Sequence, residues 1–174
     1  MYADCRTIQS KMSRKQSGMM AAKRSLSAGD ISEEHSAREC VELAIKKFKR
    51  LDVLVNNAGV FLDNAMTEDY PIADFDETIR MNIRSAFMMT RFALPYLKKT
   101  RGNIISAGSE SGMIGLAQNT SYGGTKGWMH AFTRGVAVEQ AKMECARTVF
   151  VQDRSTRRGR IKRLARWTRR WKRV

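Results

Sequence analysis

The chain has 174 residues, a length typical of one domain, and a formal net charge of +15. No apolar run approaches the roughly 20 residues that a bilayer-spanning helix needs, and the N-terminus lacks the apolar core of a secretory signal. The three cysteines include no Cys-x-x-Cys pair, which argues against a disulfide framework or a zinc site and predicts a cytoplasmic protein.

The excess positive charge lies at the two ends of the chain. Residues 1–26 contain six Lys/Arg and one acidic residue, and residues 143–174 contain twelve Lys/Arg and two acidic residues. Residues 27–142 contain fourteen of each and are neutral. The sequence therefore predicts a neutral globular core at 27–142, between an irregular basic flank and a basic tail.

The core begins with a predicted helix and a predicted strand. Ser32 is a suitable N-cap, and Glu33 and Glu34 place negative charge in the first turn, where the helix dipole favours it. The apolar residues that then recur at helical spacing are Ala37, Val41, Ala44, Ile45 and Phe48. The apolar run 51–55 predicts a strand buried on both faces, and the small polar segment 56–59 ends it.

A second helix is predicted after Asp74 and Glu77, which resemble a capping box. Its expected apolar positions are Ile79, Ile83, Phe87, Leu94 and Leu97. Pro95 predicts a kink or a break near its end. Asn82 lies on the side of Ile79 and Ile83, where a buried amide must find hydrogen-bond partners; a partly exposed amide is the alternative.

A second strand is predicted at 103–107, a loop of small residues at 108–119, and a third helix at 122–140. Much of the apolar surface of this helix comes from Trp128, Ala131, Phe132, Val136 and Val138. The alternation of helices and short apolar strands is typical of a doubly wound α/β sheet.

Three side chains between residues 109 and 126 suggest proton transfer. A helix that starts at Tyr122 places Tyr122 and Lys126 on one face, one turn apart. A nearby cation lowers a phenol pKa from roughly 10 toward the range that is useful for acid–base catalysis. Ser109 adds a hydroxyl thirteen residues before the tyrosine. By spacing alone, an ordinary helix start remains the alternative.

Taken in order, these motifs make residues 27–142 resemble the short-chain dehydrogenase/reductase family, which has a Rossmann-type fold. The matching motifs are Asn56-Asn57-Ala58-Gly59 after a strand, Met81-Asn82-Ile83 in the next helix, Ser109 after the next strand, and Tyr122-Gly-Gly-Thr-Lys126. A bare Tyr-x-x-x-Lys is common by chance, whereas the ordered set is specific. The resemblance implies a Rossmann-like doubly wound parallel sheet.

The resemblance also implies an oxidoreductase that transfers hydride between NAD or NADP and a small-molecule alcohol or carbonyl substrate. Tyr122 would be the general acid/base, and Lys126 would lower its pKa and bind the nicotinamide ribose. Ser109 would hydrogen-bond the substrate oxygen, and Asn82 would hold the water of a proton relay behind Lys126. The residues implied on the adenosine side of the cofactor are Asn57, Ala58, Gly59 and, near the adenine, Asp30.

Both ends of the chain depart from the family pattern. The family begins with a strand and a Gly-rich turn that receives the pyrophosphate, but Gly18 is the only glycine in residues 1–26. The family continues into another strand and a Pro-Gly turn, but residues 143–174 contain no proline. We therefore expect an incomplete fold that lacks the first βαβ unit and the C-terminal strands. In the complete enzyme, the helices at 75–100 and 122–140 would contribute to a homo-oligomer.

A shifted reading frame would explain both ends. Read from the third base of each codon, Met19-Met20-Ala21 encodes Asp-Gly. The codons that follow permit an amino-acid sequence that resembles the family sequence just before Gly29. The same offset from Lys142 permits a strand followed by Pro-Gly. We therefore hypothesise that residues 1–26 and 143–174 are translated out of frame. The alternative function is then a catalytically inactive, truncated or frameshifted fragment.

The basic tail also has binding alternatives. Its apolar residues Ile161, Leu164, Ala165 and Trp171 fall roughly on one helical face among Arg and Lys. Such a segment could bind an anionic membrane, and arginines interleaved with Trp167 and Trp171 could bind nucleic acid. An uncommitted basic tail is the simpler interpretation.

Overall fold

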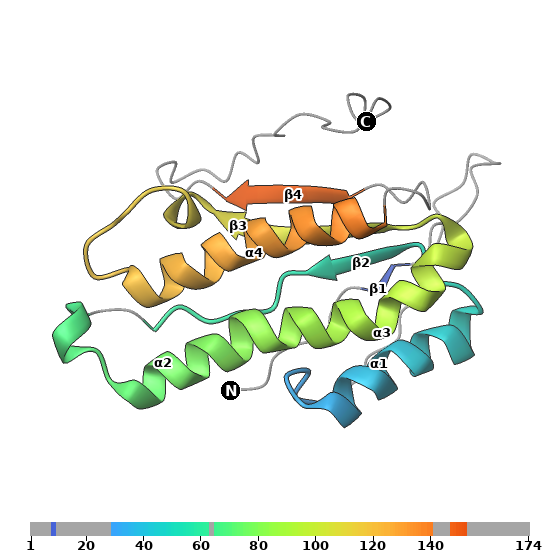
Figure 1. Ribbon diagram of the computed structural model, residues 1–174. Helices are drawn as coiled ribbons and strands as arrows, with labels where there is room; N and C mark the ends of the chain where they lie inside the picture. The colour runs from blue at the N-terminus through green and yellow to red at the C-terminus, as the bar shows by residue number, and fades with distance from the viewer. Residues whose placement is uncertain (1–7, 10–28, 63–64, 141–146, 153–174) are drawn as a thin grey trace, which may run out of the picture.

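The structure is a computed structural model that describes residues 8–9, 29–62, 65–140 and 147–152. In chain order the elements are β1 (Ile8–Gln9), α1 (Glu34–Phe48), β2 (Val53–Asn56), the 3₁₀ turn η1 (Thr67–Asp69), α2 (Ile72–Ile79), the π-helical turn η2 (Arg80–Arg84), α3 (Ser85–Thr100), β3 (Asn103–Ser109), the 3₁₀ turn η3 (Glu110–Gly112), α4 (Thr120–Glu139) and β4 (Arg147–Gln152). These elements form one sheet with helices packed against it (Figure 1).

The sheet has the strand order β1-β2-β3-β4. β2, β3 and β4 are parallel, so Val53 pairs with Asn103 and Ile104 pairs with Arg147. The helical segments α2, η2 and α3, which follow one another in line, connect β2 to β3, and α4 connects β3 to β4 (Figure 1). Parallel strands joined by helical crossovers confirm the incomplete Rossmann-like fold that the sequence predicts.

The strand β4 is a departure from the sequence-based expectation. No strand was expected after the third helix, yet Arg147–Gln152 pairs with β3 along six residues, from Ile104 to Ser109. Ile8–Gln9, within the flank expected to be irregular, pairs antiparallel with Val53 and Leu54. The proposed amphipathic face of the tail and its tryptophans lie outside the described residues.

The core of the described residues lies between the sheet and α1, α3 and α4. Leu54 of β2 and Ile104 of β3 face this core together with Ala37, Val41 and Val136 of the helices. The next residues along the strands, among them Val53, Val55 and Ile105, are only half-buried. The expectation that the strands are buried on both faces is therefore wrong for the described residues, because these three helices cover one face.

Helix α1 confirms its predicted stripe but not its predicted cap. Ala37, Val41 and Ala44 are buried. The N-cap position is Glu33, and the hydroxyl of Ser32 instead donates to Asp30. Cys40 also lies in the core and is disulfide-bonded, which the cysteine spacing does not predict.

The second predicted helix is interrupted by the π-helical turn η2, which the sequence does not reveal. An i→i+5 turn contains more residues than an α-helical turn, so the helix after it presents a different set of residues to the core. The residues buried after η2 include Ala86, Met88, Met89, Ala93 and Leu97, whereas Phe87 is 41% exposed. Only Leu97 of the five expected apolar positions is fully buried, because the prediction assumed an uninterrupted period.

The ends of this helical segment also differ from the prediction. The helix begins at Ile72 after Pro71, and Glu77 binds Arg80 instead of closing a capping box. Pro95 lies inside α3, which continues to Thr100 without a break.

Within the described residues, no helix is both long enough and apolar enough to cross a membrane.

Candidate active site

The carboxyl ends of β2 and β3 lie at the same edge of the sheet, on the left in Figure 1. The segment after β2 starts at Asn57, the segment after β3 contains η3, and α4 begins beside them. Ligands of open parallel sheets bind at this edge. All the predicted site residues except Asp30 come from these segments or from η2, which contacts them.

Tyr122 and Lys126 lie on one face of the first turns of α4, as the sequence predicts. The Nζ atom of Lys126 is 5.4 Å from the centroid of the Tyr122 ring. The Tyr122 ring also meets the edge of Phe61, with ring centroids 5.0 Å apart and planes nearly perpendicular. Phe61 belongs to the segment after β2, so the phenol is held between two elements.

Lys126 is buried beside the sheet. Its residue is 7% exposed, and Nζ donates a 2.8 Å hydrogen bond to the carbonyl of Ala107 in β3. Burial lowers the pKa of the Lys126 ammonium, because desolvation disfavours its charged form. An ammonium has three donors, so two remain for the phenol side and for a bound ligand.

Ser109 ends β3 and is brought to α4 by glycines. Its Oγ lies 3.1 Å from the Ser111 hydroxyl and accepts a 3.3 Å hydrogen bond from the Ser111 amide. A Cβ on Gly112 would lie 2.5 Å from the carbonyl carbon of Lys126, and one on Gly123 would lie 2.8 Å from the Ser111 oxygen. The absence of side chains at Gly112 and Gly123 therefore permits η3, which follows Ser109 directly in the chain, to approach α4 closely.

Asn82 is buried at 2% exposure in the π-helical turn. Its Oδ1 accepts a 2.7 Å hydrogen bond from the Val60 amide, and its Nδ2 donates to the Val60 carbonyl at 2.9 Å and to Thr125 Oγ1 at 3.1 Å. The prediction of a buried amide with partners is confirmed. These bonds occupy the side chain, so its role in holding a relay water stays a prediction.

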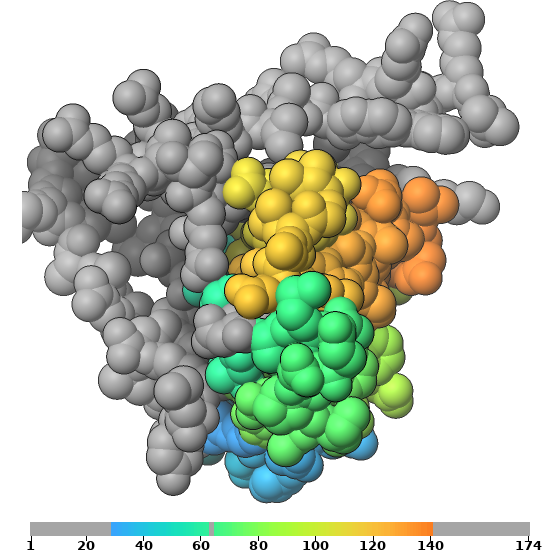
Figure 2. All heavy atoms as spheres, turned by 90° about the vertical axis from the view of Figure 1, so that its left-hand side faces the viewer, coloured from blue at the N-terminus to red at the C-terminus, as the bar shows by residue number. Residues whose placement is uncertain are grey.

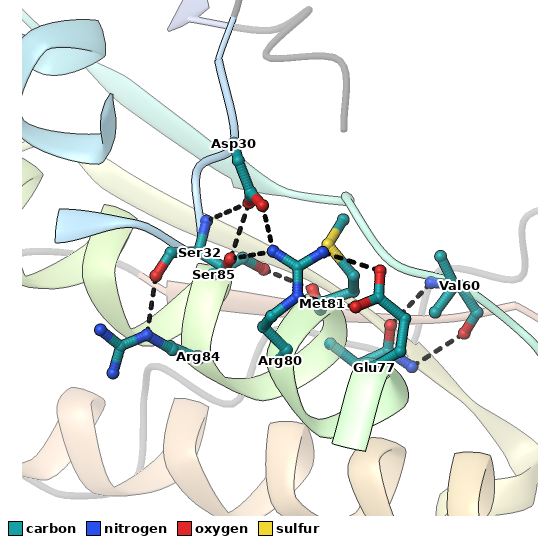
Figure 3. Close-up of polar contacts among 9 residues, drawn as sticks. Asp30, Ser32, Val60, Glu77, Arg80, Met81, Arg84 and Ser85 are labelled. Carbon is teal, nitrogen blue, oxygen red and sulfur yellow. Dashed lines mark hydrogen bonds and ion pairs between the residues drawn. The ribbon is translucent and has the colours of Figure 1, made fainter. Parts of the chain in front are cut away.

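The same π-helical turn holds Asp30 (Figure 3). Arg80 donates to Asp30 and to the Ser32 hydroxyl, and its other two nitrogens donate to Glu77 at 2.7 Å. Arg84 donates to the Ser32 carbonyl at 2.8 Å. η2 therefore joins the segment before α1 to the segment after β2, since Asn82 holds Val60.

The carboxylate of Asp30 is largely engaged by the protein itself. It accepts from the Ser32 amide and hydroxyl as well as from Arg80. Burial would raise the pKa of Asp30, but these hydrogen bonds and the Arg80 charge outweigh it and hold that pKa below its ordinary value. A carboxylate has about four lone-pair sites, so one further donor can be accommodated.

The residues present fit one half of a nicotinamide dinucleotide. Lys126 offers free donors beside Tyr122, and Asn57 and Gly59 are exposed at the sheet edge. A Cβ at Gly59 would lie 2.7 Å from Asn82 Oδ1, so a larger residue there would displace the Asn82 side chain from its hydrogen bonds. The sequence before Asp30 has no Gly-rich turn to receive the pyrophosphate. The fit is therefore to the nicotinamide ribose at Lys126 and to the adenosine side at Asn57 and Gly59, but not to the phosphates between them.

The sequence motifs do not identify four further residues of this region: Phe61, Arg80, Thr125 and His130. Phe61 and Thr125 lie inside or beside recognised motifs, so proximity in sequence could have indicated them. Arg80 contacts Asp30 across fifty residues, which no local pattern reveals. His130 is buried one turn after Lys126, and its Nε2 has no hydrogen-bond partner among the described residues.

A family model described as short chain dehydrogenase matches residues 5–152. Among curated proteins, L-fucose dehydrogenase of Bos taurus is 34% identical over 113 residues, which are 65% of this chain and 42% of that protein. The 11-beta-hydroxysteroid dehydrogenase A of Sesamum indicum is 34% identical over 110 residues, 63% of this chain and 32% of that protein. The matched segments thus span less than half of these relatives.

Solved structures of the same kind share the fold. NAD⁺-bound xylitol dehydrogenase has a TM-score of 0.69 at 26% identity, over 71% of this chain and 48% of that chain. ElxO with NADP bound has a TM-score of 0.64 at 32% identity, over 71% of this chain and 49% of that chain. Together with the family match and the order of the site motifs, these likenesses show that the chain belongs to the short-chain dehydrogenase/reductase family.

Proposed function

We propose that the chain carries the catalytic half of an NAD(P)-dependent oxidoreductase that interconverts an alcohol and a carbonyl compound. The observation that supports this most directly is the pairing of Tyr122 with a buried Lys126 on α4, which packs against η3, the turn directly after Ser109. The NAD⁺- and NADP-bound structural neighbours support a nicotinamide cofactor of either type. When bound, that cofactor accepts or donates the hydride.

The protein's own residues would then supply orientation and a proton. Ser109 donates a hydrogen bond to the substrate oxygen and fixes it beside Tyr122. In the direction of reduction, Tyr122 Oη gives its proton to that oxygen, and in the direction of oxidation it takes the proton back. Lys126 stabilises the phenolate by its charge, and its own lowered pKa follows from its burial. Asn82 keeps Val60 and Thr125 in place behind this turn.

The test compares Tyr122→Phe with Tyr96→Phe, a half-buried tyrosine on α3 outside the site. Hydride transfer is followed by the absorbance of the reduced nicotinamide with a panel of alcohols and ketones. A positioned general acid contributes about 10²–10⁴-fold, so Tyr122→Phe is expected to lose at least a hundredfold in kcat/KM and Tyr96→Phe less than twofold. Equal activity of Tyr122→Phe and the unaltered chain contradicts the proposal.

A second candidate is a catalytically inactive fragment of such an enzyme. It is favoured by the missing Gly-rich turn before Asp30. Titration of the chain with NADH and NADPH separates the two candidates. An inactive fragment would bind either cofactor weakly or not at all, because the phosphate-cradling amides are missing. A micromolar dissociation constant would instead favour an active enzyme. Sequencing the gene in all frames around codons 1–28 and 143–174 tests the frameshift.

We further propose that α3 and α4 form a homo-oligomer contact in the complete enzyme. Trp128 and Phe132 stack on α4 with ring centroids 4.5 Å apart, and Phe87 of α3 lies 6.2 Å from Phe132. Phe87 is 41% exposed. Light scattering tests the proposal: Phe87→Asp should yield a smaller species than the unaltered chain, whereas an unchanged mass refutes it.

A further inference from the structure

The edge of the sheet that carries Tyr122 is bordered by an exposed apolar surface. It consists of Met66, Met113, Ile114 and Leu116, which are 48%, 60%, 55% and 41% exposed. We call these four residues the apolar rim. Figure 2 looks at this edge and shows the segment around η1 and α2 beside the segment 110–118.

The two parts of the rim are fixed to the start of α4. Thr67, next to Met66, donates from its hydroxyl to that of Thr120, the first residue of α4, at 3.2 Å. On the other side, the amides of Met113 and Ile114 donate to the Glu110 carbonyl of η3 at 2.8 and 3.0 Å, and Gly112 of η3 lies against the Lys126 backbone in α4. Both parts therefore border the turn that contains Tyr122.

The rim is also close to Ser109. Glu110 follows Ser109 directly, and Gly112 rests on the backbone of Lys126. Phe61 adds an aromatic edge against the Tyr122 ring. We therefore expect the remaining atoms of a molecule whose oxygen reaches Ser109 and Tyr122 to face the rim.

The chemistry of this surface favours an apolar ligand. Residues 111–121 contain no ionisable side chain. Exposed apolar patches next to a functional site mark surfaces that bind apolar groups. Three ionisable residues flank the rim: Glu68 and Asp69, which are exposed in η1, and Glu110 of η3, which is half-buried. A polyol needs a hydrogen-bond partner for each hydroxyl, and methionine, isoleucine and leucine side chains supply none.

We propose that the apolar rim binds an apolar substituent of the substrate, so that the site takes apolar ring or chain ketones and alcohols in preference to sugars and polyols. This inference rests on the proposed function, because it assigns the substrate oxygen to Ser109 and Tyr122. This preference would distinguish the chain from the relatives named for L-fucose and xylitol.

Methyl NMR of the full chain tests the proposal without requiring turnover. With ¹³C-methyl methionine, the Met66 and Met113 signals are assigned from Met66→Leu and Met113→Leu, and the buried Met88 and Met89 serve as internal references. The probes are 2-decalone, an apolar bicyclic ketone, and L-fucose. We expect saturable shifts of Met66 and Met113 with 2-decalone, and none with L-fucose at ten times that concentration.

Two variants sharpen the result. Ile114→Ser should weaken 2-decalone binding at least fivefold, whereas Leu43→Ser on α1, 37% exposed, should leave it unchanged. Shifts with L-fucose instead of 2-decalone overturn the proposal, as does the absence of a rim shift with either probe. Rim shifts that change with protein concentration in the absence of a probe also overturn it, because they report self-association. Hydride transfer is measured separately, so a chain that binds 2-decalone without oxidising or reducing any substrate refutes the proposed function and not this inference.

Discussion

The contact between Gly112 and α4 gives a strong test of how the site is assembled. In Gly112→Ala, the new methyl would lie 2.5 Å from the Lys126 carbonyl carbon and 2.6 Å from the Gly127 nitrogen, whereas ordinary contact begins at 3.4 Å. Both atoms belong to the backbone of α4, so neither can rotate away. Overpacking of this kind costs about 1–3 kcal/mol. For a chain of this size, each kcal/mol lowers Tm by about 2–4 °C.

We therefore expect Gly112→Ala to lower Tm by about 2–12 °C in circular dichroism melts. It should also reduce any hydride transfer, because η3 carries Ser109 to Tyr122. The matched control is Gly135→Ala in α4, where a Cβ meets nothing within 4 Å. That substitution should raise the unfolding free energy by about 0.5–1 kcal/mol through helix propensity. If Gly112→Ala melts at or above the unaltered chain, or if both variants fall equally, η3 does not rest on α4 as described.

Four further substitutions test the site and its supports. Asn82→Ala removes the hydrogen-bond partners of the Val60 amide and carbonyl. It should lower the unfolding free energy measured in urea by about 2–3 kcal/mol, and an unchanged value would contradict these hydrogen bonds. Arg80→Met removes the cation that helps to hold the pKa values of Asp30 and Glu77 low. The stability that these carboxylates contribute above their unfolded pKa values, and that is lost in acid, should therefore shrink by about 1 kcal/mol. The pKa of His130 is lowered by burial and by the charges of Arg134 and Lys126. The chain should therefore lose stability as the pH falls below about 6.5. His130→Leu should reduce this pH dependence of Tm in melts at pH 5 to 8. Lys126→Met should abolish hydride transfer while leaving Tm unchanged or raised, because it removes a buried cation. A large fall in Tm would show that the Lys126 hydrogen bond to the Ala107 carbonyl stabilises the fold by more than burial of the charge costs.

The sequence by itself determined the family and predicted the chemistry of the site. The order of Asn56-Asn57-Ala58-Gly59, Asn82, Ser109, Tyr122 and Lys126 is readable along the chain, because each motif is local. The four-residue step from Tyr122 to Lys126 also predicts their common face, which the 5.4 Å contact confirms. Helices and strands appeared near their predicted positions, since hydrophobic periodicity reports local structure.

Only the tertiary structure decided how these parts are held together. The π-helical turn η2 changes which residues of α3 face the core, and it links Asp30 to Arg80 and Val60 to Asn82. The closeness of Gly112 to Lys126 is likewise a contact between separate elements. Such features depend on packing between segments fourteen to fifty residues apart, and a periodic pattern within one helix does not contain that information.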